Sequence, residues 1–374
     1  MFFEKNGVRS IDFLLTASAI RKINKKWKKF ADEIKDYETN FNDKGIVICA
    51  GGLEHLTCAW VNIKMIRRSG CQLPVEVWYL GNEISVKMLN EISSLNVVCK
   101  NFLDYGDYNI AGFSLKPLAI FLSSFKEVLF LDSDNVCTKN PDYLFDNQDY
   151  KTYGSMFWPD FWKTSEDNPI WEIVECNDYQ VPEQESGQIL VNKEKCWKEL
   201  NLCLYFNLNN NVYHKFLYGD KDTFKFAWSA LKTPYFMIQK SPGICGYHDD
   251  DGLFLGHTIV QHDPDGEILF LHRNLLKWNV TLPEEKVWEK IKIFNSISDQ
   301  SEFLLGYSKR SHMYMDFAGD VDQLDVKELF FSELENECLI VLSDLIQQQF
   351  YSDFMKYSHM REKRFNSPKA VFGF

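Results

Sequence analysis

Residues 128–135 read VLFLDSDN, an apolar run that leads directly into Asp132, Ser133 and Asp134. The apolar run is typical of a buried strand, so two carboxylates stand one residue apart at its end. Like charges this close repel, and each raises the pKa of the other. A divalent cation held by the two aspartates would remove this repulsion and keep coordination positions free for substrate phosphates. The stretch therefore predicts a metal site at the end of a strand.

Strands and helices alternate around this stretch. Four segments read as strands, with helical segments between them: 45–52, 75–81, 96–102 and 127–132. The alternation predicts an α/β fold in which helices flank a Rossmann-like, mostly parallel sheet. Ligands of such sheets lie beyond the carboxyl ends of the strands. Gly51, Gly52 and the Asp132/Asp134 pair fall at such ends.

The composition excludes several classes of protein. The chain has 374 residues, 45% of them hydrophobic, which is enough to bury a large core. Its formal net charge of −12 argues against nucleic-acid binding, which needs a basic surface, and suits an enzyme that attracts cations. No apolar run reaches the roughly 18–20 residues of a membrane span. None of the ten cysteines forms a C-x-x-C pair. We expect a soluble, cytoplasmic protein with reduced thiols.

The segment 11–38 shows the helical spacing of apolar residues and carries the basic cluster RKINKKWKK at 21–29. The simpler interpretation is a surface helix packed on the main domain. A basic amphipathic helix could also make peripheral contact with an anionic membrane. The sequence leaves both possibilities open.

A second apolar run, ILFL, ends at His272. An imidazole at a strand end is an available third ligand for a borderline ion such as Mn²⁺. Arg273 and Lys277, which follow closely, could offset diphosphate charge. Taken alone, His272 would be interpreted as a hydrogen-bonded loop histidine. The HDDD stretch at 248–251 lies in a glycine-rich loop and is interpreted as a solvated turn.

Other polar residues stand at helix starts and turns. Lys116 begins a helix just before the strand of the metal site, where it could contact a phosphate or simply be solvated. Glu185 and Gln188 flank a glycine that leads into a strand, and Asp220 and Asp222 precede an apparent helix. These groups could hydrogen-bond sugar hydroxyls, although the two aspartates could equally be N-caps.

These motifs occur together and in a fixed order. They read G-x-x-x-K-P-x-A-I at 112–120, VLFLDSDN at 128–135, E-S-G-Q-x-L-V at 185–191, GDKDTF at 219–224 and F-L-H-R-N-L-x-K-W at 270–278. The order resembles the fungal alpha-mannosyltransferase family that elongates mannan side chains in the secretory pathway. The resemblance covers residues 45–280, and several motifs in order are more specific than any one of them.

The resemblance implies a type A glycosyltransferase fold and retaining transfer of mannose from GDP-mannose to a glycan or glycoconjugate, with Mn²⁺ or Mg²⁺ as cofactor. By position, Asp132, Asp134 and His272 would hold the metal ion, and Asp134, Glu185 and Asp222 would be the catalytic candidates. The donor-binding candidates would be Gly51, Gly52, Lys116, Asp132, Ser133, Gln188, Asp220, Arg273 and Lys277.

The pattern of residues along the chain suggests how it is organised. Residues 1–44 are predicted to form an N-terminal helical segment, and residues 281–374 a mostly helical C-terminal appendage. Between them lies the catalytic domain, with a nucleotide-binding half at 45–149 and an acceptor and sugar half at 150–280.

Several alternatives remain open. A UDP-sugar-dependent glucosyl- or galactosyltransferase would use the same D-x-D and histidine pattern. A nucleotidyltransferase also needs paired aspartates, whereas the missing G-x-x-x-x-G-K and G-x-S-x-G patterns disfavour ATPases and α/β hydrolases. The aromatic stretch MFWPDFWK at 156–163 would suit a non-catalytic carbohydrate-binding protein. For a retaining transferase, the sequence does not choose between front-face attack and a covalent glycosyl carboxylate, for which Glu185 and Asp222 are the residues to check.

Overall fold

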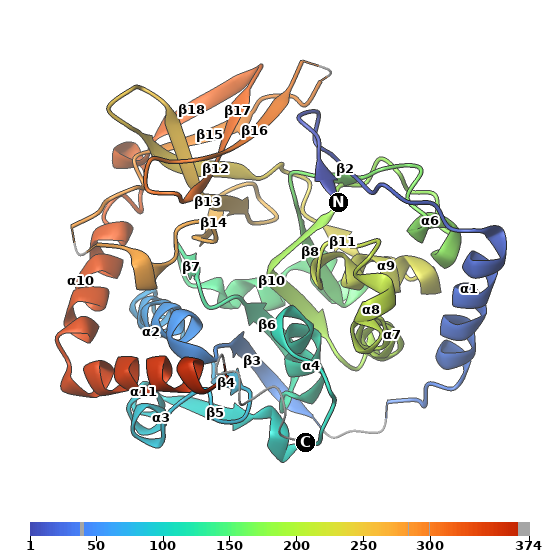
Figure 1. Cartoon of the computed structure of the whole chain (residues 1–374), viewed down its shortest axis with the longest axis horizontal. Helices are drawn as coiled ribbons and strands as arrows, with labels where there is room; N and C mark the ends of the chain where they lie inside the picture. Colours follow the sequence, from blue (N-terminus) through green and yellow to red (C-terminus); the bar gives the residue numbers. More distant parts are fainter. Residues whose placement is uncertain (38–40, 283, 299, 366–374) are drawn as a thin grey trace.

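The computed structural model describes residues 1–37, 41–282, 284–298 and 300–365. A seven-stranded sheet lies at its centre, in the order β11-β8-β10-β6-β3-β4-β5 (Figure 1). Strand β10 runs against its neighbours β6 and β8, and every other neighbouring pair is parallel. This confirms the predicted mostly parallel α/β sheet. Its strands are β3 (Asn42–Cys49), β4 (Val75–Tyr79), β5 (Val97–Asn101), β6 (Phe125–Leu131), β8 (Ser155–Pro159), β10 (Gln184–Asn192) and β11 (Phe236–Met237).

The side chains of β3 show how both faces of this sheet are covered. Ile46 and Ile48 pack in the core shared with α2, and Val47 packs in the core shared with α4; all three are fully buried. A strand covered on both faces needs the near-continuous apolar run that the sequence shows. The first core includes α2 (Gly52–Arg68), α3 (Val86–Ser93), α10 (Leu334–Ile346) and α11 (Gln349–Phe365). The second includes α1 (Ala17–Asp32), α4 (Leu115–Leu122), α6 (Ile170–Val174), α7 (Trp197–Leu208), α8 (Asn210–Tyr213) and α9 (Lys221–Leu231). A short helix, α5 (Gln148–Tyr153), precedes β8.

The helices that connect the parallel strands change faces of the sheet between β3 and β6. Helices α2 and α3, which connect β3 to β4 and β4 to β5, pack on one face of the sheet, whereas α4, which connects β5 to β6, packs on the other. The carboxyl ends of β3 and β6 therefore lie side by side at a topological switch point. Open α/β sheets bind their ligands at such points.

A second sheet brings a distant part of the chain to this switch point. Six of its strands run in the order β16-β17-β13-β12-β15-β18, and β14 links β13 to β7. Strand β7 begins at Asn135, directly after the two aspartates, and Asn135 pairs with His272 at the end of β14. The second sheet thus holds the predicted histidine beside the predicted carboxylates. Its strands are β7 (Asn135–Cys137), β12 (Gly243–His248), β13 (Phe254–His262), β14 (Ile268–His272), β15 (Lys290–Phe294), β16 (Glu302–Tyr307), β17 (Met313–Ala318) and β18 (Val321–Asp325).

The C-terminal region differs from the prediction. Residues 290–325 form strands β15 to β18, and only 334–365 are the expected helices α10 and α11. The KIKIF stretch of β15 was expected to continue a helix, but it pairs with β12 and β18 and buries Ile291 and Phe294. The boundary expected at residue 280 consequently falls inside the second sheet. The sequence pattern failed here because charged residues at period two fit a half-exposed strand as well as a helix face.

The N-terminal region contains strands as well as the predicted helix. Strand β2 (Val8–Ser10) pairs with β1 (Phe2–Phe3) on one side and with β9 (Lys163–Thr164) on the other. Helix α1 buries Ile20 and Trp27, and the Trp27 indole donates a hydrogen bond to the Ile173 carbonyl at 2.8 Å. The helix is therefore packed on the main domain, and membrane contact through its basic residues stays a prediction. Among the described residues, no helix combines the length and the apolar character needed to span a bilayer.

Candidate active site

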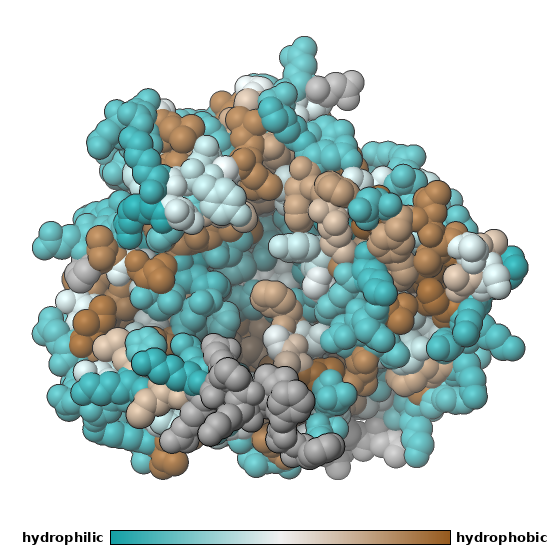
Figure 2. All heavy atoms as spheres, viewed as in Figure 1, coloured by the Kyte–Doolittle hydropathy of each residue, from teal (hydrophilic) through white to brown (hydrophobic). Residues whose placement is uncertain are grey.

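Two aspartates and a histidine meet at the switch point. Asp132 follows β6 and Asp134 precedes β7, while His272 ends β14. One ligand atom from each of the three lies within 4.8 Å of the others. His272 Nε2 is 3.1 Å from Asp134 Oδ1 and 3.7 Å from Asp132 Oδ2. Figure 2 shows that this face of the molecule is hollowed near its centre, with hydrophilic side chains around the hollow, where Figure 1 places β7 and β14.

The charges of this cluster are balanced by nearby cations. Burial alone would raise the pKa of Asp134, but His272 and Lys277, which both contact its carboxylate, hold the pKa far below its usual value. Burial alone would lower the pKa of His272, but the carboxylates of Asp134 and Glu185 outweigh it and raise the pKa to about 10. Protonated His272 and Lys277 thus supply the positive charge that two adjacent carboxylates require.

The donor set fits a divalent metal ion. Two carboxylates and an imidazole are ligands that Mn²⁺ accepts, and Mg²⁺ accepts the carboxylates. A metal ion would take over the charge balance that the protonated imidazole provides, and its binding would release that proton. The Asp132 side chain is 26% exposed, whereas that of Asp134 is 2% exposed. The open side of the cluster therefore lies at Asp132, where substrate phosphates could reach it.

Strand β10 supplies the carboxylate that contacts the second ring nitrogen of His272. Glu185 Oε1 lies 3.1 Å from His272 Nδ1, and the Gln188 side chain donates to Glu185 Oε2 at 2.7 Å. Asn135 donates in turn to the Gln188 side-chain oxygen at 2.7 Å. A carboxylate on the second nitrogen of a metal-binding histidine fixes the ring and its tautomer. The structure thus places Glu185 and Gln188 on the Nδ1 side of the His272 ring, whereas the aspartates lie on its Nε2 side.

Gly187 permits this contact between β10 and β14. A Cβ atom at Gly187 would lie 2.4 Å from His272 Nδ1, which is too close for any side chain. Sequence reasoning did not single out this glycine. The signal was present in the E-S-G-Q motif, because a glycine inside a strand often marks a close approach of another group.

Lys116 links the metal cluster to a further aspartate. Its Nζ lies 3.0 Å from Asp132 Oδ2 and 3.4 Å from Asp220 Oδ2, and it donates to the carbonyl and hydroxyl oxygens of Ser186 at 2.8 Å. Burial opposes the charged form, but the surrounding carboxylates, Asp132 and Asp220 foremost, raise the pKa of Lys116 well above its usual value. Lys116 is thus a buried cation, and the alternative of a solvated helix-end lysine is excluded. Asp220 precedes α9 without capping it through its side chain.

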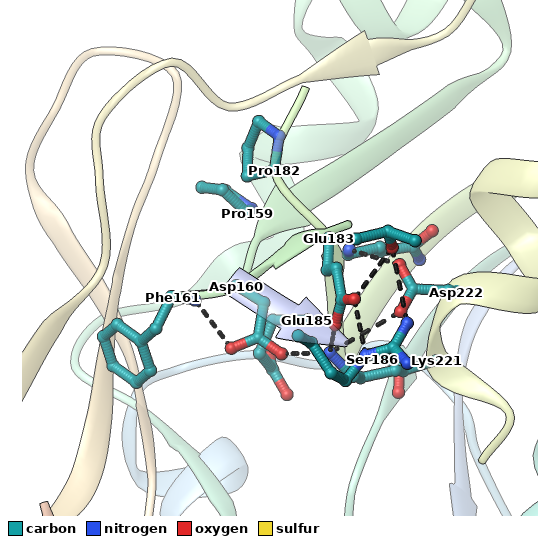
Figure 3. Close-up of polar contacts among 12 residues, drawn as sticks. Pro159, Asp160, Phe161, Pro182, Glu183, Glu185, Ser186, Lys221 and Asp222 are labelled. Atoms are coloured by element: carbon teal, nitrogen blue, oxygen red, sulfur yellow. Dashed lines mark hydrogen bonds and ion pairs between the residues drawn. The ribbon is translucent and has the colours of Figure 1, made fainter. Parts of the chain in front are cut away.

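Asp222 belongs to a different network, shown in Figure 3. Its Oδ1 accepts a hydrogen bond from the Gln184 backbone at 3.0 Å, and its side chain is fully buried. Lys221 donates to both Asp160 and Glu183 at 2.5 Å and lies 3.6 Å from Asp222 Oδ2. Arg9 joins the network through Glu183 at 2.6 Å. The structure therefore uses Asp222 to fix α9 against β10 and does not bring it into the metal cluster.

Arg273 also lies apart from the cluster, contrary to expectation. Its guanidinium group is fully buried, pairs with Glu335 of α10 at 2.8 Å and lies over the Trp278 ring at 4.2 Å. It also donates to Leu276 O at 2.7 Å and to the Thr281 hydroxyl at 3.1 Å. The alternation of side chains about His272 sends the next residue to the opposite face, so Arg273 anchors the C-terminal helix while Lys277 returns to Asp134.

The start of helix α2 contains the two predicted glycines, and the helix also supplies Asn62 and His55, which the sequence did not reveal. Gly51 precedes the helix and Gly52 begins it with a φ of +66°, a conformation that glycine adopts without strain. Asn62 donates to the Asp132 carbonyl at 3.1 Å, and His55 Nδ1 lies 3.4 Å from the Ser133 hydroxyl. The HDDD stretch is the β12–β13 turn, in which Asp249 accepts two backbone hydrogen bonds, as predicted.

Three features of this chain define the type A glycosyltransferase class. They are a mostly parallel sheet with one reversed strand, a carboxylate pair at its switch point and a histidine from a later part of the chain. Residues 43–183 and 175–263 match the family described as "Mannosyltransferase putative". The match covers more than half of the chain, and the chain therefore belongs to this mannosyltransferase family.

Two of the curated relatives of this chain are named alpha-1,2-mannosyltransferases. Alpha-1,2-mannosyltransferase MNN21 of Candida albicans is 27% identical over 71% of this chain and 49% of its own length. Alpha-1,2-mannosyltransferase MNN2 of Saccharomyces cerevisiae is 27% identical over 67% of this chain and 51% of its own length. The chain thus spans about half the length of the curated relatives it matches.

Solved structures resemble the chain more distantly. The glycosyltransferase GlyE of Streptococcus pneumoniae covers 53% of this chain, with 46% of its own length, at 16% identity and a TM-score of 0.36. Core-mannan synthase A of Aspergillus fumigatus, in its Mn/GDP form, covers 53% of this chain, with 74% of its own length, at 11% identity and a TM-score of 0.32.

Proposed function

We propose that this chain is a metal-dependent retaining mannosyltransferase that moves mannose from GDP-mannose to a hydroxyl group of a glycan or glycoconjugate. The observation that carries the proposal is the cluster of Asp132, Asp134 and His272 at the switch point of a nucleotide-binding type of sheet. Membership of the mannosyltransferase family and the alpha-1,2-mannosyltransferase names of the curated relatives support mannose as the transferred sugar.

Asp132, Asp134 and His272 would hold Mn²⁺ or Mg²⁺. The ion supplies Lewis-acid stabilisation of the negative charge that develops on the departing diphosphate. The partly exposed Asp132 side faces the substrate, while Glu185 and Gln188 keep the His272 ring in one orientation. Lys277, whose side chain is 25% exposed, stands beside Asp134, where it adds positive charge at the same place.

Lys116 and Asp220 would define the sugar side of the site. Lys116 is held by Asp132, Asp220 and Ser186, so its charge is fixed in position before substrate binds. Preorganised charges of this kind stabilise a transition state without paying for reorganisation during the reaction. Asp220, which lies 3.4 Å from the Lys116 ammonium group, would accept hydrogen bonds from hydroxyl groups of the transferred hexose.

The surroundings of the carboxylates favour front-face attack over a covalent intermediate. Both Glu185 oxygens are engaged, one by His272 and the Gly187 backbone and the other by Gln188. Asp222 is fully buried in its own network. In front-face transfer the bond between the sugar carbon and the phosphate oxygen breaks, the acceptor oxygen bonds to that carbon from the same side, and the acceptor proton passes to the leaving phosphate oxygen.

The test is a binding and transfer panel on the full chain. The donors are GDP-mannose, UDP-glucose, UDP-galactose and UDP-N-acetylglucosamine, each with Mn²⁺ and with EDTA, and an α-mannose oligosaccharide serves as acceptor. A ligand at about 100 times its dissociation constant should add about 2.7 kcal/mol of stability, which a thermal-shift assay detects. We expect a shift and product only with GDP-mannose and Mn²⁺. A shift with UDP sugars alone would overturn the donor, and no shift with any nucleotide sugar would overturn the proposal.

A further inference from the structure

A carboxylate that no motif indicated lies at the same edge of the sheet as the metal cluster. Glu83 stands on the connection from β4 to α3, and its Oε2 accepts a hydrogen bond from the Leu80 backbone at 3.0 Å. A Cβ atom at Gly51 would lie 1.8 Å from this oxygen, so the carboxylate covers the Gly51 backbone. Its other oxygen, Oε1, lies 3.9 Å from the Arg361 guanidinium group, and the Glu83 side chain remains 24% exposed. A ligand at the strand ends can therefore reach it.

Glu83 and Asp132 flank the end of β3 from opposite sides. Glu83 follows β4 and Asp132 follows β6, and these two strands are the neighbours of β3. Burial raises the pKa of the Cys49 thiol at the end of β3, and the carboxylates of Asp132, Asp220 and Glu83 add to the shift. Two strand spacings separate β4 from β6, which is about 10 Å. A nucleoside diphosphate can span such a distance between its ribose and its terminal phosphate.

Leu80, whose backbone binds this carboxylate, also lines a cavity. The cavity has a volume of about 310 Å³ and is lined chiefly by apolar and aromatic side chains, among them Leu80, Phe102, Tyr108, Ile110, Leu115 and Leu118. Flat apolar walls suit the stacking of a nucleotide base. Leu80 binds Glu83 through its backbone and also lines the cavity. Along the strand ends, the metal cluster is therefore followed by Glu83 and then by the cavity.

We propose that Glu83 binds the ribose hydroxyl groups of the nucleotide donor, with the base in this cavity and the diphosphate at the metal cluster. The proposal rests on the proposed function, since it takes a nucleoside diphosphate sugar as the ligand. A carboxylate has two oxygens that can accept hydrogen bonds from the neighbouring 2′- and 3′-hydroxyl groups. An acidic residue near the end of the second strand has the same role in dinucleotide-binding sheets. Gly51 is needed because any side chain there would displace Glu83.

The experiment is a ligand cycle measured by calorimetry in the presence of Mn²⁺. GDP, 2′-deoxy-GDP, 3′-deoxy-GDP and inosine diphosphate are titrated into the wild-type chain, Glu83→Gln and Gly51→Ala. We expect Glu83→Gln and Gly51→Ala each to weaken GDP binding about tenfold or more, because a charged hydrogen-bond partner is lost. Each deoxy nucleotide should bind the wild type about as weakly as GDP binds Glu83→Gln. The Glu83→Gln change should lower the affinity for the deoxy nucleotides little further. Glu91→Gln, a carboxylate change on α3, is the matched control and should bind GDP as the wild type does.

The outcomes separate this inference from the proposed function. Equal binding of GDP by the wild type and Glu83→Gln would overturn the ribose contact and leave the donor intact. The ribose contact would also be overturned if Glu83→Gln lowered the affinity for GDP and for the deoxy nucleotides by the same factor. If Glu83→Gln weakened the binding of GDP but not that of inosine diphosphate, the carboxylate would contact the base, and the ribose assignment would be refuted. If the wild type bound no nucleotide, the proposed function itself would fail. Far-ultraviolet circular dichroism of each variant checks that the fold is kept.

Discussion

The buried pair of Arg273 and Glu335 gives the sharpest prediction about stability. The Glu335 carboxylate accepts hydrogen bonds from Arg273 at 2.8 Å, from the Val287 backbone at 2.9 and 3.0 Å, and from the Trp288 backbone at 2.8 Å. Glu335→Ala would leave a fully buried guanidinium group without its counter-charge and two backbone donors without acceptors. Removing one member of such a pair costs about 3–5 kcal/mol.

The magnitude can be converted into a melting temperature. With an unfolding entropy of about 2.1 cal/mol/K per residue over 374 residues, that loss lowers Tm by roughly 4–6 °C. Differential scanning calorimetry of the wild type and Glu335→Ala measures the shift. Glu337→Gln on the same helix is the control, because its contact with Arg68 is exposed and a surface pair contributes at most about 1 kcal/mol.

A double variant decides whether Arg273 has the structural role assigned to it. Arg273→Met and Glu335→Leu should each destabilise the chain, whereas the double variant should recover much of the loss, since apolar residues can replace a buried ion pair. The reasoning is refuted if the Tm of Glu335→Ala lies within about 1 °C of the wild type. It is also refuted if Arg273→Met keeps its stability but no longer binds GDP, because Arg273 would then contact the donor as the sequence suggested.

Three further predictions concern the metal site and pH. Asp134→Asn should abolish transfer from GDP-mannose, measured by mass spectrometry of the product, whereas Asp146→Asn, an exposed change, should keep full activity. Gly187→Ala should lower kcat/KM and Mn²⁺ affinity at least about tenfold, since its Cβ atom would displace His272, and unchanged metal affinity would contradict this. Burial lowers the pKa of His262 to about 4, so between pH 6.5 and 4 the unfolded state binds more protons and stability falls as the pH falls. His262→Phe should remove about 1 kcal/mol of the loss between pH 7.5 and 5.5 in urea titrations, and an unchanged pH dependence would exclude the assignment.

Strands β3, β4, β5 and β6 of the central sheet were predictable because their signals are local. Each is a short run rich in apolar residues, and β3, β4 and β6, which lie inside the sheet, have most of their apolar residues buried. The segment 290–325 was not predictable in the same way. Its strands are half exposed, and the alternation in KIKIF acquires meaning only when β12 and β18 lie on either side of it. Pairing partners that are distant in sequence therefore decided this part of the fold.

The sequence by itself determined the carboxylate pair at the end of β6 and the histidine at the end of β14, because strand ends and their side chains follow from local pattern. Only the tertiary structure decided which charged neighbours face the site. The pairing of β7 with β14 turns His272 and Lys277 toward Asp134 and sends Arg273 to Glu335. The approach of β4 to Gly51 likewise brings in Glu83, which no motif marked. The physical reason is that side-chain direction depends on register and on counter-charges from distant segments, and neither is written in any short stretch of sequence.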